Sequence, residues 1–319
     1  MVPVSGDISE VLLVNFLAGL GDGLYVNGLL HYLTSCGVKV QIATLPKLKV
    51  IHQTVLSEEN IHNVLDSETR SQLASHNWDV VLDLSGSVWS KWDARVDLLM
   101  KLKSPVIGID KLIRNNHLAC SEYIDVTNCA HIGSRWAKLA NRITGQDITL
   151  IPPYVGLHPQ KREERYIYVN TAGSCHHRTL SSEQIGWISE VLNKERILGL
   201  FYAPQNIQIK ESAFVKRISP FSFAEACRLV GGAIGVITPD TSIAHVASAY
   251  ERPQLTFFPG NTWDFLGFPT SEEFTPLGKY IIVKPKRKPR LAKEIVPISA
   301  ITKEELGTAL QEFFAMLSP

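Results

Sequence analysis

The sequence of 319 residues lacks an excess of either charge: 32 lysines and arginines stand against 31 aspartates and glutamates, and the net charge is +1. A chain that binds nucleic acid usually carries a basic field, which this composition does not supply. We therefore expect no nucleic-acid partner, and any attraction to an anionic surface has to be local.

Cysteine is scarce and scattered, and no two cysteines form a C-x-x-C arrangement. The five are Cys36, Cys120, Cys129, Cys175 and Cys227. This spacing disfavours a disulfide framework and a zinc site. It fits free, buried thiols in a reducing compartment, so we expect a cytoplasmic protein.

The chain also lacks a long apolar run and a basic N-terminal region. Its first apolar run, residues 11–16, is interrupted by Asn15 and followed by glycines, which predicts a first strand and not a signal peptide. No segment is apolar over enough residues to cross a bilayer. A membrane role would have to be peripheral.

What is present is a 45% hydrophobic composition and an alternation of short apolar strands with amphipathic helices. The length favours two domains, and the alternation predicts parallel sheets with helices on their faces. The first series is a strand at 11–16, a glycine-rich turn at 18–23, a helix at 24–33 and a strand at 38–43. This is the opening of a Rossmann-like domain. The glycines do not follow G-x-G-x-x-G and no acid ends the second strand, which disfavours a nicotinamide or flavin site.

A domain boundary is indicated after the amphipathic helix at 131–145, which ends in a glycine. Residues 151–165 carry three prolines and a charge run, the composition of a linker. We expect domains at 1–155 and 156–319, both Rossmann-like. The second begins with a strand at 166–169 and ends with a helix at 302–316, which a capping box between Thr302 and Glu305 starts.

Asp22 lies between Gly21 and Gly23 in the first glycine-rich turn. A carboxylate there would repel a bound diphosphate. It suits a base or a group that binds a hydroxyl of a neutral substrate. The alternative is a helix N-terminal acid that the helix dipole stabilises, and the residues alone do not separate the two.

The polar groups of the second half gather in residues 234–260. A short strand runs into Pro239, then Asp240, Thr241 and Ser242 begin a short helix, and another strand follows. Such a turn aims backbone N–H groups and the positive end of a helix at an anion. Thr241 and His245 are four residues apart and share a face of that helix. The alternative is an ordinary helix cap and an interior histidine.

Two basic segments remain. His177 and Arg178 follow the strand at 166–169 and are expected over the carboxyl edge of the second sheet, where a leaving phosphate is a plausible partner. A solvated basic loop is the alternative, preferred for His176. The run of residues 284–290, from Lys284 to Arg290, is either a solvated loop or a contact for anionic lipid headgroups or a phosphorylated acceptor.

Together these features resemble the GT-B architecture, and more specifically glycosyltransferase family 9, the ADP-heptose:lipopolysaccharide heptosyltransferases. The turn Gly21-Asp22-Gly23-Leu24 resembles the G-D-x-L turn of that family. Residues 240–247 resemble its D-[ST]-G-x-x-H-x-A signature, and residues 131–145 its H-x-x-x-R-x-x-x-L helix. The resemblance implies an α/β GT-B fold, two Rossmann-like doubly wound domains facing each other across a cleft, with the acceptor bound by the first and the donor by the second.

The resemblance also implies roles for the matching positions. Asp22 corresponds to the general base on the acceptor hydroxyl, and the turn with Gly21 and Gly23 faces the acceptor side. The residues that hold the diphosphate and sugar of the donor are Asp240, Thr241, Ser242 and His245. Where the family has a K-R-W-P-like turn, this chain has His177-Arg178-Thr179-Leu180. Arg178 therefore becomes the cation for the leaving phosphate, and His177 is a second donor-binding residue beside it. Ser242 stands where the family has glycine.

The function so implied is an inverting, metal-independent transfer of a heptose from ADP-heptose to a glycan or glycolipid hydroxyl, in lipopolysaccharide or lipooligosaccharide core biosynthesis. The sequence has no D-x-D pair of the kind that holds a metal on a nucleotide sugar, and no cofactor is expected beyond the donor. The alternatives are a transferase of the same fold with another donor, such as a UDP-hexosamine, or another acceptor, and a non-catalytic GT-B protein that binds a glycan. We expect it in the cytoplasm, with peripheral contact to the inner face of the bacterial inner membrane through residues 284–290 as a further option.

Overall fold

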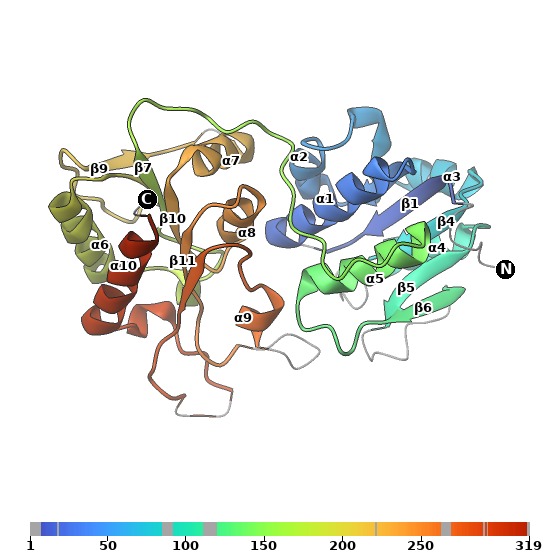
Figure 1. The fold of residues 1–319 in the computed structure, drawn as a ribbon. Helices are drawn as coiled ribbons and strands as arrows, with labels where there is room; N and C mark the ends of the chain where they lie inside the picture. Colours follow the sequence, from blue (N-terminus) through green and yellow to red (C-terminus); the bar gives the residue numbers. More distant parts are fainter. Residues whose placement is uncertain are drawn as a thin grey trace. The chain divides into compact units, whose positions relative to one another are not determined.

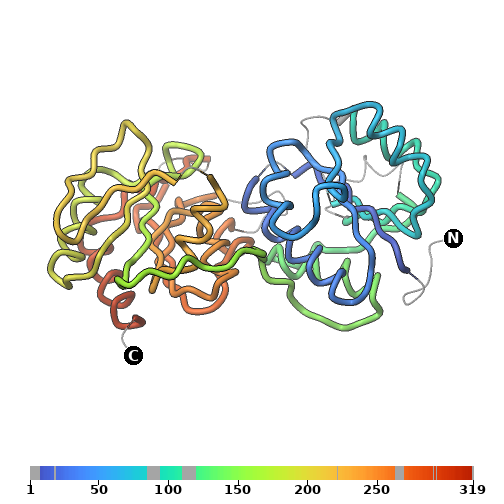
Figure 2. The backbone as a smooth tube through the Cα atoms, turned by 90° about the horizontal axis from the view of Figure 1, so that it is seen from above, coloured from blue at the N-terminus to red at the C-terminus, as the bar shows by residue number. Residues whose placement is uncertain are grey.

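The chain forms two compact units, Met1–Gly156 and Leu157–Pro319, which are described one at a time. The structure is a computed structural model that describes residues 8–17, 19–84, 92–110, 120–220, 222–262, 269–289, 291 and 293–317, with only the backbone at 92, 93 and 110. Figure 1 shows each unit as a sheet layered between helices, and Figure 2 follows the backbone from a second direction.

The first unit contains a parallel six-stranded sheet with the order β3-β2-β1-β4-β5-β6. Its strands are β1 (Glu10–Asn15), β2 (Lys39–Thr44), β3 (Ile61–Asn63), β4 (Val80–Asp83), β5 (Val106–Asp110) and β6 (Glu122–Asp125). β1 and β4 lie side by side, with Val11 opposite Val80. The chain winds outward from β1 to one edge and from β4 to the other. This is the doubly wound arrangement that the sequence predicted.

Helices cover both faces of the first sheet because its central strands are apolar on both sides. The helices are α1 (Leu20–Ser35), α2 (Lys49–His52), α3 (Ser67–Ser75), α4 (Trp92–Lys101) and α5 (Ile132–Thr144). Leu12 and Val14 of β1 pack with residues of α3 and α4, while α1 and α5 pack against each other (Figure 1). α5 ends at Gly145 in the left-handed conformation, with φ 71°, which confirms the predicted glycine stop.

The second unit repeats the same sheet, with the order β12-β11-β10-β7-β8-β9 and all strands parallel. Its strands are β7 (Tyr166–Asn170), β8 (Leu198–Tyr202), β9 (Val215–Ile218), β10 (Gly235–Pro239), β11 (Gln254–Phe257) and β12 (Tyr280–Val283). β7 and β10 are neighbours at the centre, as β1 and β4 are in the first unit. The α/β class with two Rossmann-like sheets is therefore confirmed.

The helices of the second unit also form two layers. They are α6 (Ser182–Glu195), α7 (Phe223–Gly232), α8 (Ser242–Ala249), α9 (Thr270–Glu273) and α10 (Lys303–Leu317). Ile188 of α6 and Phe313 of α10 share a core with Ile167 and Ile237, whereas α7 and α8 pack together (Figure 1). The predicted capping box of α10 is confirmed, because the Thr302 N–H donates to Glu305 Oε2 at 2.8 Å and the Glu305 N–H donates to Thr302 Oγ1 at 3.3 Å.

The proline-containing segment between α5 and β7 has no helix or strand, and its two halves are fastened to different units. In the first unit the Tyr154 N–H donates to the Leu24 carbonyl at 3.0 Å. In the second, the Tyr250 hydroxyl donates to the Leu157 carbonyl at 2.7 Å. Hydrogen bonds therefore hold this segment on either side of the division between the units.

The expectation that all five cysteines are buried is wrong. Cys129 and Cys227 are buried, but Cys36 is exposed and Cys120 and Cys175 are partly exposed. Cys36 follows α1 at its solvated C-terminal end. Cys175 lies in the loop after β7, which is too short and polar to bury the thiol. All five are free thiols, as predicted. Among the described residues, no helix is long and apolar enough to span a bilayer.

Candidate functional site

The second sheet has a point where the winding direction reverses, between β7 and β10. After β7 the chain turns toward β8, and after β10 it turns toward β11, so the two connections diverge. In open parallel sheets, ligands bind outside the carboxyl ends of the strands at such a point. The loop of residues 171–181 and the turn of residues 240–241 are therefore the places to look for a binding site.

The turn after β10 is built as a helix N-terminus. Thr241 is the N-cap of α8, with extended backbone, and its Oγ1 accepts from the Ile243 N–H at 3.2 Å. The predicted cap is confirmed. Ser242 opens the helix and is partly exposed. The N-terminal N–H groups and the positive end of the helix dipole favour a bound anion.

Asn170, the last residue of β7, joins the two strand ends. It is 2% exposed, and its Nδ2 donates to Thr238 Oγ1 at 3.2 Å and to Thr241 Oγ1 at 3.1 Å. Thr238 in turn donates to the Pro239 carbonyl at 2.9 Å. This buried network fixes the N-cap of α8 relative to β7, so that the helix terminus has one defined position at the switch point.

Arg178 lies against Asp240 on the other side of the turn. Its Nη1 is 3.3 Å from Asp240 Oδ2 and also donates to the Asp240 carbonyl at 3.3 Å. The Asp240 side chain is 4% exposed and that of Arg178 is 29% exposed. Arg178 is thus a partly solvated cation held at the carboxyl edge by a buried acid. The acid offsets part of its charge, and the helix terminus supplies further attraction for an anion.

The loop that carries Arg178 lies over the start of α8. The Gly173 N–H donates to the Arg178 carbonyl at 2.8 Å. A Cβ at Gly173 would come within 2.7 Å of Arg178 Cβ and 3.3 Å of Thr241 Cγ2, so only glycine fits this approach. His176, His177 and Arg178 form the 3₁₀-helix η4 (His176–Arg178). His177 is partly buried, and its Nε2 is within hydrogen-bond distance of Cys175 Sγ.

His245 lies inside the second unit. It is 3% exposed, on α8, and its ring is 5.5 Å from the ring of Phe274 at a tilt of 52°. The sequence placed it on the same face as Thr241, and it lies one helical turn further along α8. A contact of His245 with a donor stays a prediction.

Asp22 lies within a helix and not in a turn, because α1 already begins at Leu20. The expected turn at Gly21 and Gly23 is therefore wrong: both are in the first turn of α1. Gly23 is buried, and a Cβ there would come within 3.3 Å of Ile51 Cδ1, so close packing on α2 accounts for this glycine.

The Asp22 carboxylate folds back over the start of its own helix. A Cβ at Gly19, the N-cap, would come within 2.5 Å of Asp22 Oδ2. Asp22 is partly exposed and stands at the carboxyl end of β1, beside the point where the first sheet reverses its winding. The positive end of α1 favours its ionised form, which is the form that accepts a proton.

Part of the second unit is similar to a known protein family. Residues 205–291 match the sequence model of the family described as glycosyltransferase family 9 (heptosyltransferase). This segment is similar to glycosyltransferase family 9. The matched segment contains the α8 turn from Asp240 to His245 and does not reach Asp22 or Arg178. No curated protein sequence matches the chain.

Solved structures of this glycosyltransferase family share the fold over nearly the whole chain. The glycosyl transferase family 9 protein from Veillonella parvula DSM 2008 is 12% identical, with a TM-score of 0.70 and coverage of 98% of this chain and 99% of that one. E. coli heptosyltransferase WaaC with ADP is 16% identical, with a TM-score of 0.68 and coverage of 97% and 100%. E. coli ADP-heptose lps heptosyltransferase II is 12% identical, with a TM-score of 0.71 and coverage of 96% and 99%. The chain thus has the two-domain GT-B fold.

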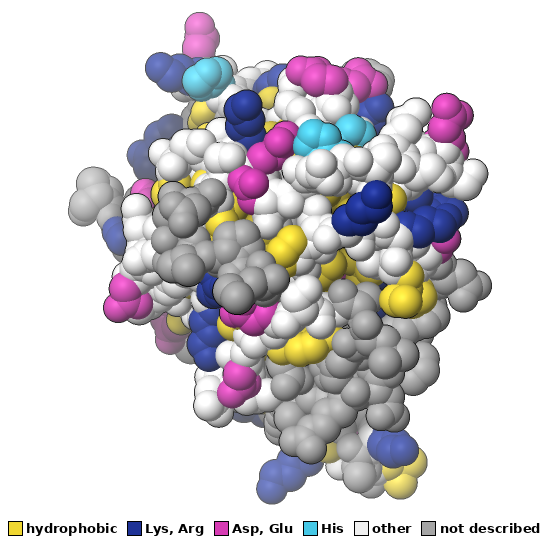
Figure 3. Space-filling model, turned by 90° about the vertical axis from the view of Figure 1, so that its right-hand side faces the viewer, with side chains coloured by type: hydrophobic (Ala, Val, Ile, Leu, Met, Phe, Trp, Pro, Cys, Tyr) yellow, Lys and Arg dark blue, Asp and Glu magenta, His cyan; other side chains and the backbone are white. Residues whose placement is uncertain are grey.

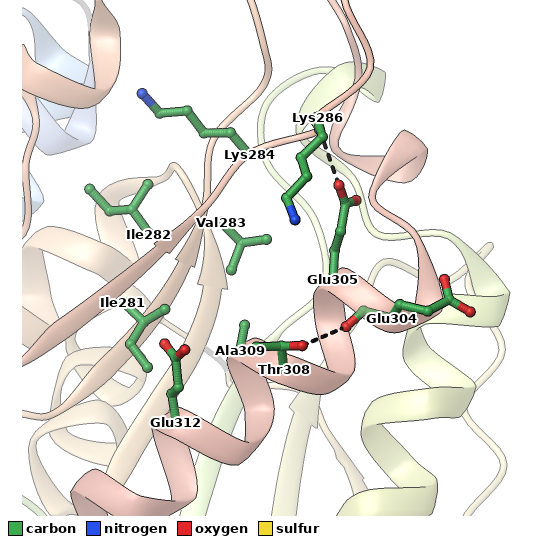
Figure 4. A pocket seen from close by; sticks show the side chains of 10 residues that line it. All are labelled: Ile281, Ile282, Val283, Lys284, Lys286, Glu304, Glu305, Thr308, Ala309 and Glu312. Carbon is green, nitrogen blue, oxygen red and sulfur yellow. Dashed lines mark hydrogen bonds between the residues drawn. The ribbon is translucent and has the colours of Figure 1, made fainter.

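A pocket elsewhere in the second unit does not coincide with the switch point. It has a volume of about 310 Å³ and lies between β12 and α10. Figure 4 shows Glu304, Glu305 and Glu312 from α10 opposite Lys284 and Lys286, which follow β12. Glu305 is already engaged in the α10 capping box, and the mixed charges give the pocket no preference for one sign of ligand.

The basic run therefore has acidic neighbours. Lys284, Lys286 and Lys288 are exposed, Arg287 forms an ion pair with Glu294 at 2.5 Å, and Arg290 lies outside the described residues. Acidic and basic side chains are also interspersed on the face in Figure 3. Within the described ranges, no group of three or more His, Cys, Asp or Glu side chains could hold a metal ion.

The sequence reasoning missed Asn170 and Thr238 as parts of the site. A signal was present, since each is a polar residue near the end of an otherwise apolar strand. The pairing of Cys175 with His177 was also missed, although the two are only two residues apart. A loop of this length brings such residues together only once its hydrogen bonds are formed.

Proposed function

We propose that this glycosyltransferase transfers a heptose from ADP-heptose to a glycan hydroxyl with inversion at the anomeric carbon, and that its acceptor is the core of a lipopolysaccharide or lipooligosaccharide. The observation that carries the proposal is the N-terminus of α8 beside Arg178 at the switch point. The N-terminus of α8 lies within the segment that matches the family 9 model, and Arg178 lies outside that segment. Among the similar structures, E. coli WaaC was solved with ADP and with ADP-2-deoxy-2-fluoro heptose. These names support an ADP-linked heptose as the donor.

In this proposal the α8 turn and Arg178 bind the diphosphate of the donor. The N–H groups at Thr241 and Ser242 point toward the phosphate oxygens, and the helix dipole adds to their effect. Arg178 donates to the phosphate from the guanidinium edge that Asp240 leaves accessible. As the bond between the sugar and ADP breaks, negative charge grows on the diphosphate. Groups that are already in place stabilise this charge most in the transition state.

Asp240, His177 and His245 complete the donor site in the proposal. Asp240 holds Arg178 in position through its buried carboxylate. His177 adds a second donor in the same loop, and His245 contacts the sugar from α8. Ser242 contributes a hydroxyl where the family has glycine, so it brings a further hydrogen-bonding group to the donor.

Asp22 is the general base of the proposed reaction. Its carboxylate removes the proton from the acceptor hydroxyl while that oxygen attacks the anomeric carbon. The attack comes from the side opposite ADP, so the new glycosidic bond has inverted configuration and ADP leaves with the electron pair. Gly19, the N-cap of α1, leaves the Asp22 carboxylate its position, because a Cβ there would come within 2.5 Å of Asp22 Oδ2.

We propose that neither a metal ion nor a cofactor is required, because a cation and a helix terminus can take up the charge of the leaving diphosphate. Turnover should be unchanged after treatment with a strong chelator. Loss of turnover that added Mg²⁺ or Mn²⁺ restores would contradict this part of the proposal.

A transfer assay tests the function. The enzyme is incubated with ADP-heptose and a heptose-deficient core oligosaccharide, and both ADP release and the mass gain of the acceptor are measured. Asp22→Asn should lower turnover by a factor on the order of 10² to 10⁴, the usual contribution of a general base, with ADP affinity nearly unchanged. Glu68→Gln is the control, because Glu68, like Asp22, is an acid in the first turn of a helix of the first unit. Equal turnover of Asp22→Asn and Glu68→Gln would remove Asp22 from the mechanism.

We propose further that the protein acts in the cytoplasm and contacts the inner membrane through the exposed lysines of residues 284–290. Lys284, Lys286 and Lys288 support this, since each cationic side chain near an anionic surface adds about 1 kcal/mol of attraction. Sedimentation with anionic liposomes should fall when all three are changed to glutamine. Equal sedimentation of the wild type and this variant would contradict the contact.

A further inference from the structure

One of the five cysteines has a chemical environment that differs from those of the other four. Cys175 Sγ lies 3.0 Å from His177 Nε2, and the thiol is partly exposed. By contrast, burial raises the pKa of the Cys120 thiol to about 11 and that of Cys227 to about 12. Since the thiolate is the reactive form, these two are poor nucleophiles. Cys36 is exposed at the end of α1 and offers an internal comparison.

The arrangement around Cys175 is that of a nucleophile with an adjacent base. Desolvation, together with the charges of His176 and Arg178, lowers the pKa of His177. The ring of His177 is therefore neutral near pH 7 and can accept the thiol proton. The 3₁₀-helix η5 (Ile298–Ala300) packs against this loop and carries no titratable side chain.

The loop is rigid enough to couple the sulfur to the donor turn. The Arg178 N–H donates to the Cys175 carbonyl at 3.0 Å, and Thr179 Oγ1 donates to the same carbonyl at 3.1 Å. Gly173 closes the loop on the Arg178 carbonyl at 2.8 Å. A group attached to Cys175 therefore sits on the loop that positions Arg178, whose guanidinium contacts Asp240 at the start of α8.

We propose that Cys175 and His177 form a thiol–disulfide exchange site whose modification switches off the donor turn. His177 Nε2 takes the proton of the Cys175 thiol, and the sulfur attacks a low-molecular-weight disulfide RSSR. One S–S bond forms between Cys175 and RS, the original S–S bond breaks, and RS⁻ leaves with its electron pair. A free thiol reverses the reaction. The switching part rests on the proposed donor site, whereas the reactivity of the thiol does not.

Labelling with oxidised glutathione tests the reactivity. The native enzyme is incubated near pH 7 and the mixed disulfides are located by peptide mass spectrometry. Cys175 should react about tenfold or more faster than Cys36, as expected for base assistance. His177→Gln should remove this difference, and His176→Gln, the control, should keep it, while thermal melts confirm that both variants are folded. Equal rates at Cys175 and Cys36, or equal effects of the two variants, would overturn the site.

Calorimetric titration with ADP tests the switch. Glutathionylated wild-type enzyme should bind ADP at least about tenfold more weakly than the reduced enzyme, and Cys175→Ser should be insensitive to oxidised glutathione. Reduction with dithiothreitol should restore binding. If reduced enzyme binds ADP and glutathionylated enzyme binds it equally well, the switch is refuted. If reduced enzyme does not bind ADP at all, the proposed donor site has failed, and the labelling rates still decide whether Cys175 is reactive.

Discussion

Replacing Asn170 by alanine tests the network that holds the α8 terminus at the switch point. The substitution removes the two hydrogen bonds that Asn170 Nδ2 donates, to Thr238 at 3.2 Å and to Thr241 at 3.1 Å, and a longer one that Asn170 Oδ1 accepts from the Ala172 N–H at 3.5 Å. The two shorter bonds contribute about 1 kcal/mol each, which gives about 2 kcal/mol, and the bond at the 3.5 Å limit adds little to this. Thr238 still donates to the Pro239 carbonyl and Thr241 still accepts from Ile243, so neither hydroxyl is left without a partner and the loss stays near this value. For a unit of this size, about 2 kcal/mol lowers the melting temperature by about 4–8 °C.

The assay is differential scanning calorimetry of the wild type, Asn170→Ala and a matched control, Asn193→Ala. Asn193 also makes two hydrogen bonds, to Ser189 and Ser212, but is exposed on α6. Its removal should change stability by no more than about 0.5 kcal/mol. ADP affinity should fall in Asn170→Ala alone, because only that variant releases the N-cap. Melting of Asn170→Ala within about 1 °C of Asn193→Ala, or unchanged ADP affinity, would refute the reasoning.

Three further predictions concern the ion pair, the first unit and the proposed base. Arg178→Gln should weaken ADP binding about 10- to 100-fold in calorimetry, because a charged hydrogen bond is lost. Arg165→Gln, at the other end of β7, should leave ADP binding unchanged. Equal ADP affinities of the two variants would remove Arg178 from the site. Burial lowers the pKa of His52 to about 3. In the unfolded chain the histidine has a pKa near 6.5, so below that pH it binds a proton that the folded protein does not. The unfolding free energy should therefore fall by about 1.4 kcal/mol for each unit by which the pH is lowered from about 6 to about 4. His52→Gln should lack this slope in urea titrations, and an equal slope would contradict the assignment. Gly19→Ala places a methyl 2.5 Å from Asp22 Oδ2, so it should lower turnover and leave ADP affinity unchanged; wild-type turnover would show that the carboxylate position does not matter.

The sequence predicted the central strands well and missed the edges of both sheets. β1, β4, β7 and β10 are continuous apolar runs, because helices cover both of their faces. The strands left unpredicted include β3, β6, β9 and β12, which are the two edges of each sheet. They are three or four residues long and mostly half-buried or exposed. β3, β6 and β9 carry no apolar run, and the apolar run of β12 is only four residues long. Pairing with a neighbour, which is a long-range event, decides their conformation.

Glycine was the other source of error. Gly21 and Gly23 suggested a turn, because glycine is the usual residue of turns. In α1 the glycines serve close packing instead: a Cβ at Gly28 would clash with the Pro152 carbonyl, and one at Gly23 would press on Ile51. Short-range sequence signals could not show these contacts, since they come from segments 28 and more than 100 residues away along the chain.

Within the candidate site, the parts that depend on local rules were predicted and those that depend on assembly were not. Thr241 was predicted as a helix cap from its place between a strand and a helix, and it is one. The contact of Arg178 with Asp240, and the bonds from Asn170 to Thr241, join residues more than 60 positions apart. They exist only because β7 and β10 are neighbours in the sheet.

The measurement that tests the central claim most directly is a calorimetric titration of the wild-type enzyme with ADP, UDP, GDP, CMP and NAD. A ligand that binds only the folded state also raises the melting temperature, which gives an independent readout on the same samples. The account predicts binding and stabilisation by ADP alone, with both reduced in Arg178→Gln. Selective binding of UDP would contradict the ADP-heptose donor, and binding of none of the five would contradict a nucleotide site at the α8 turn.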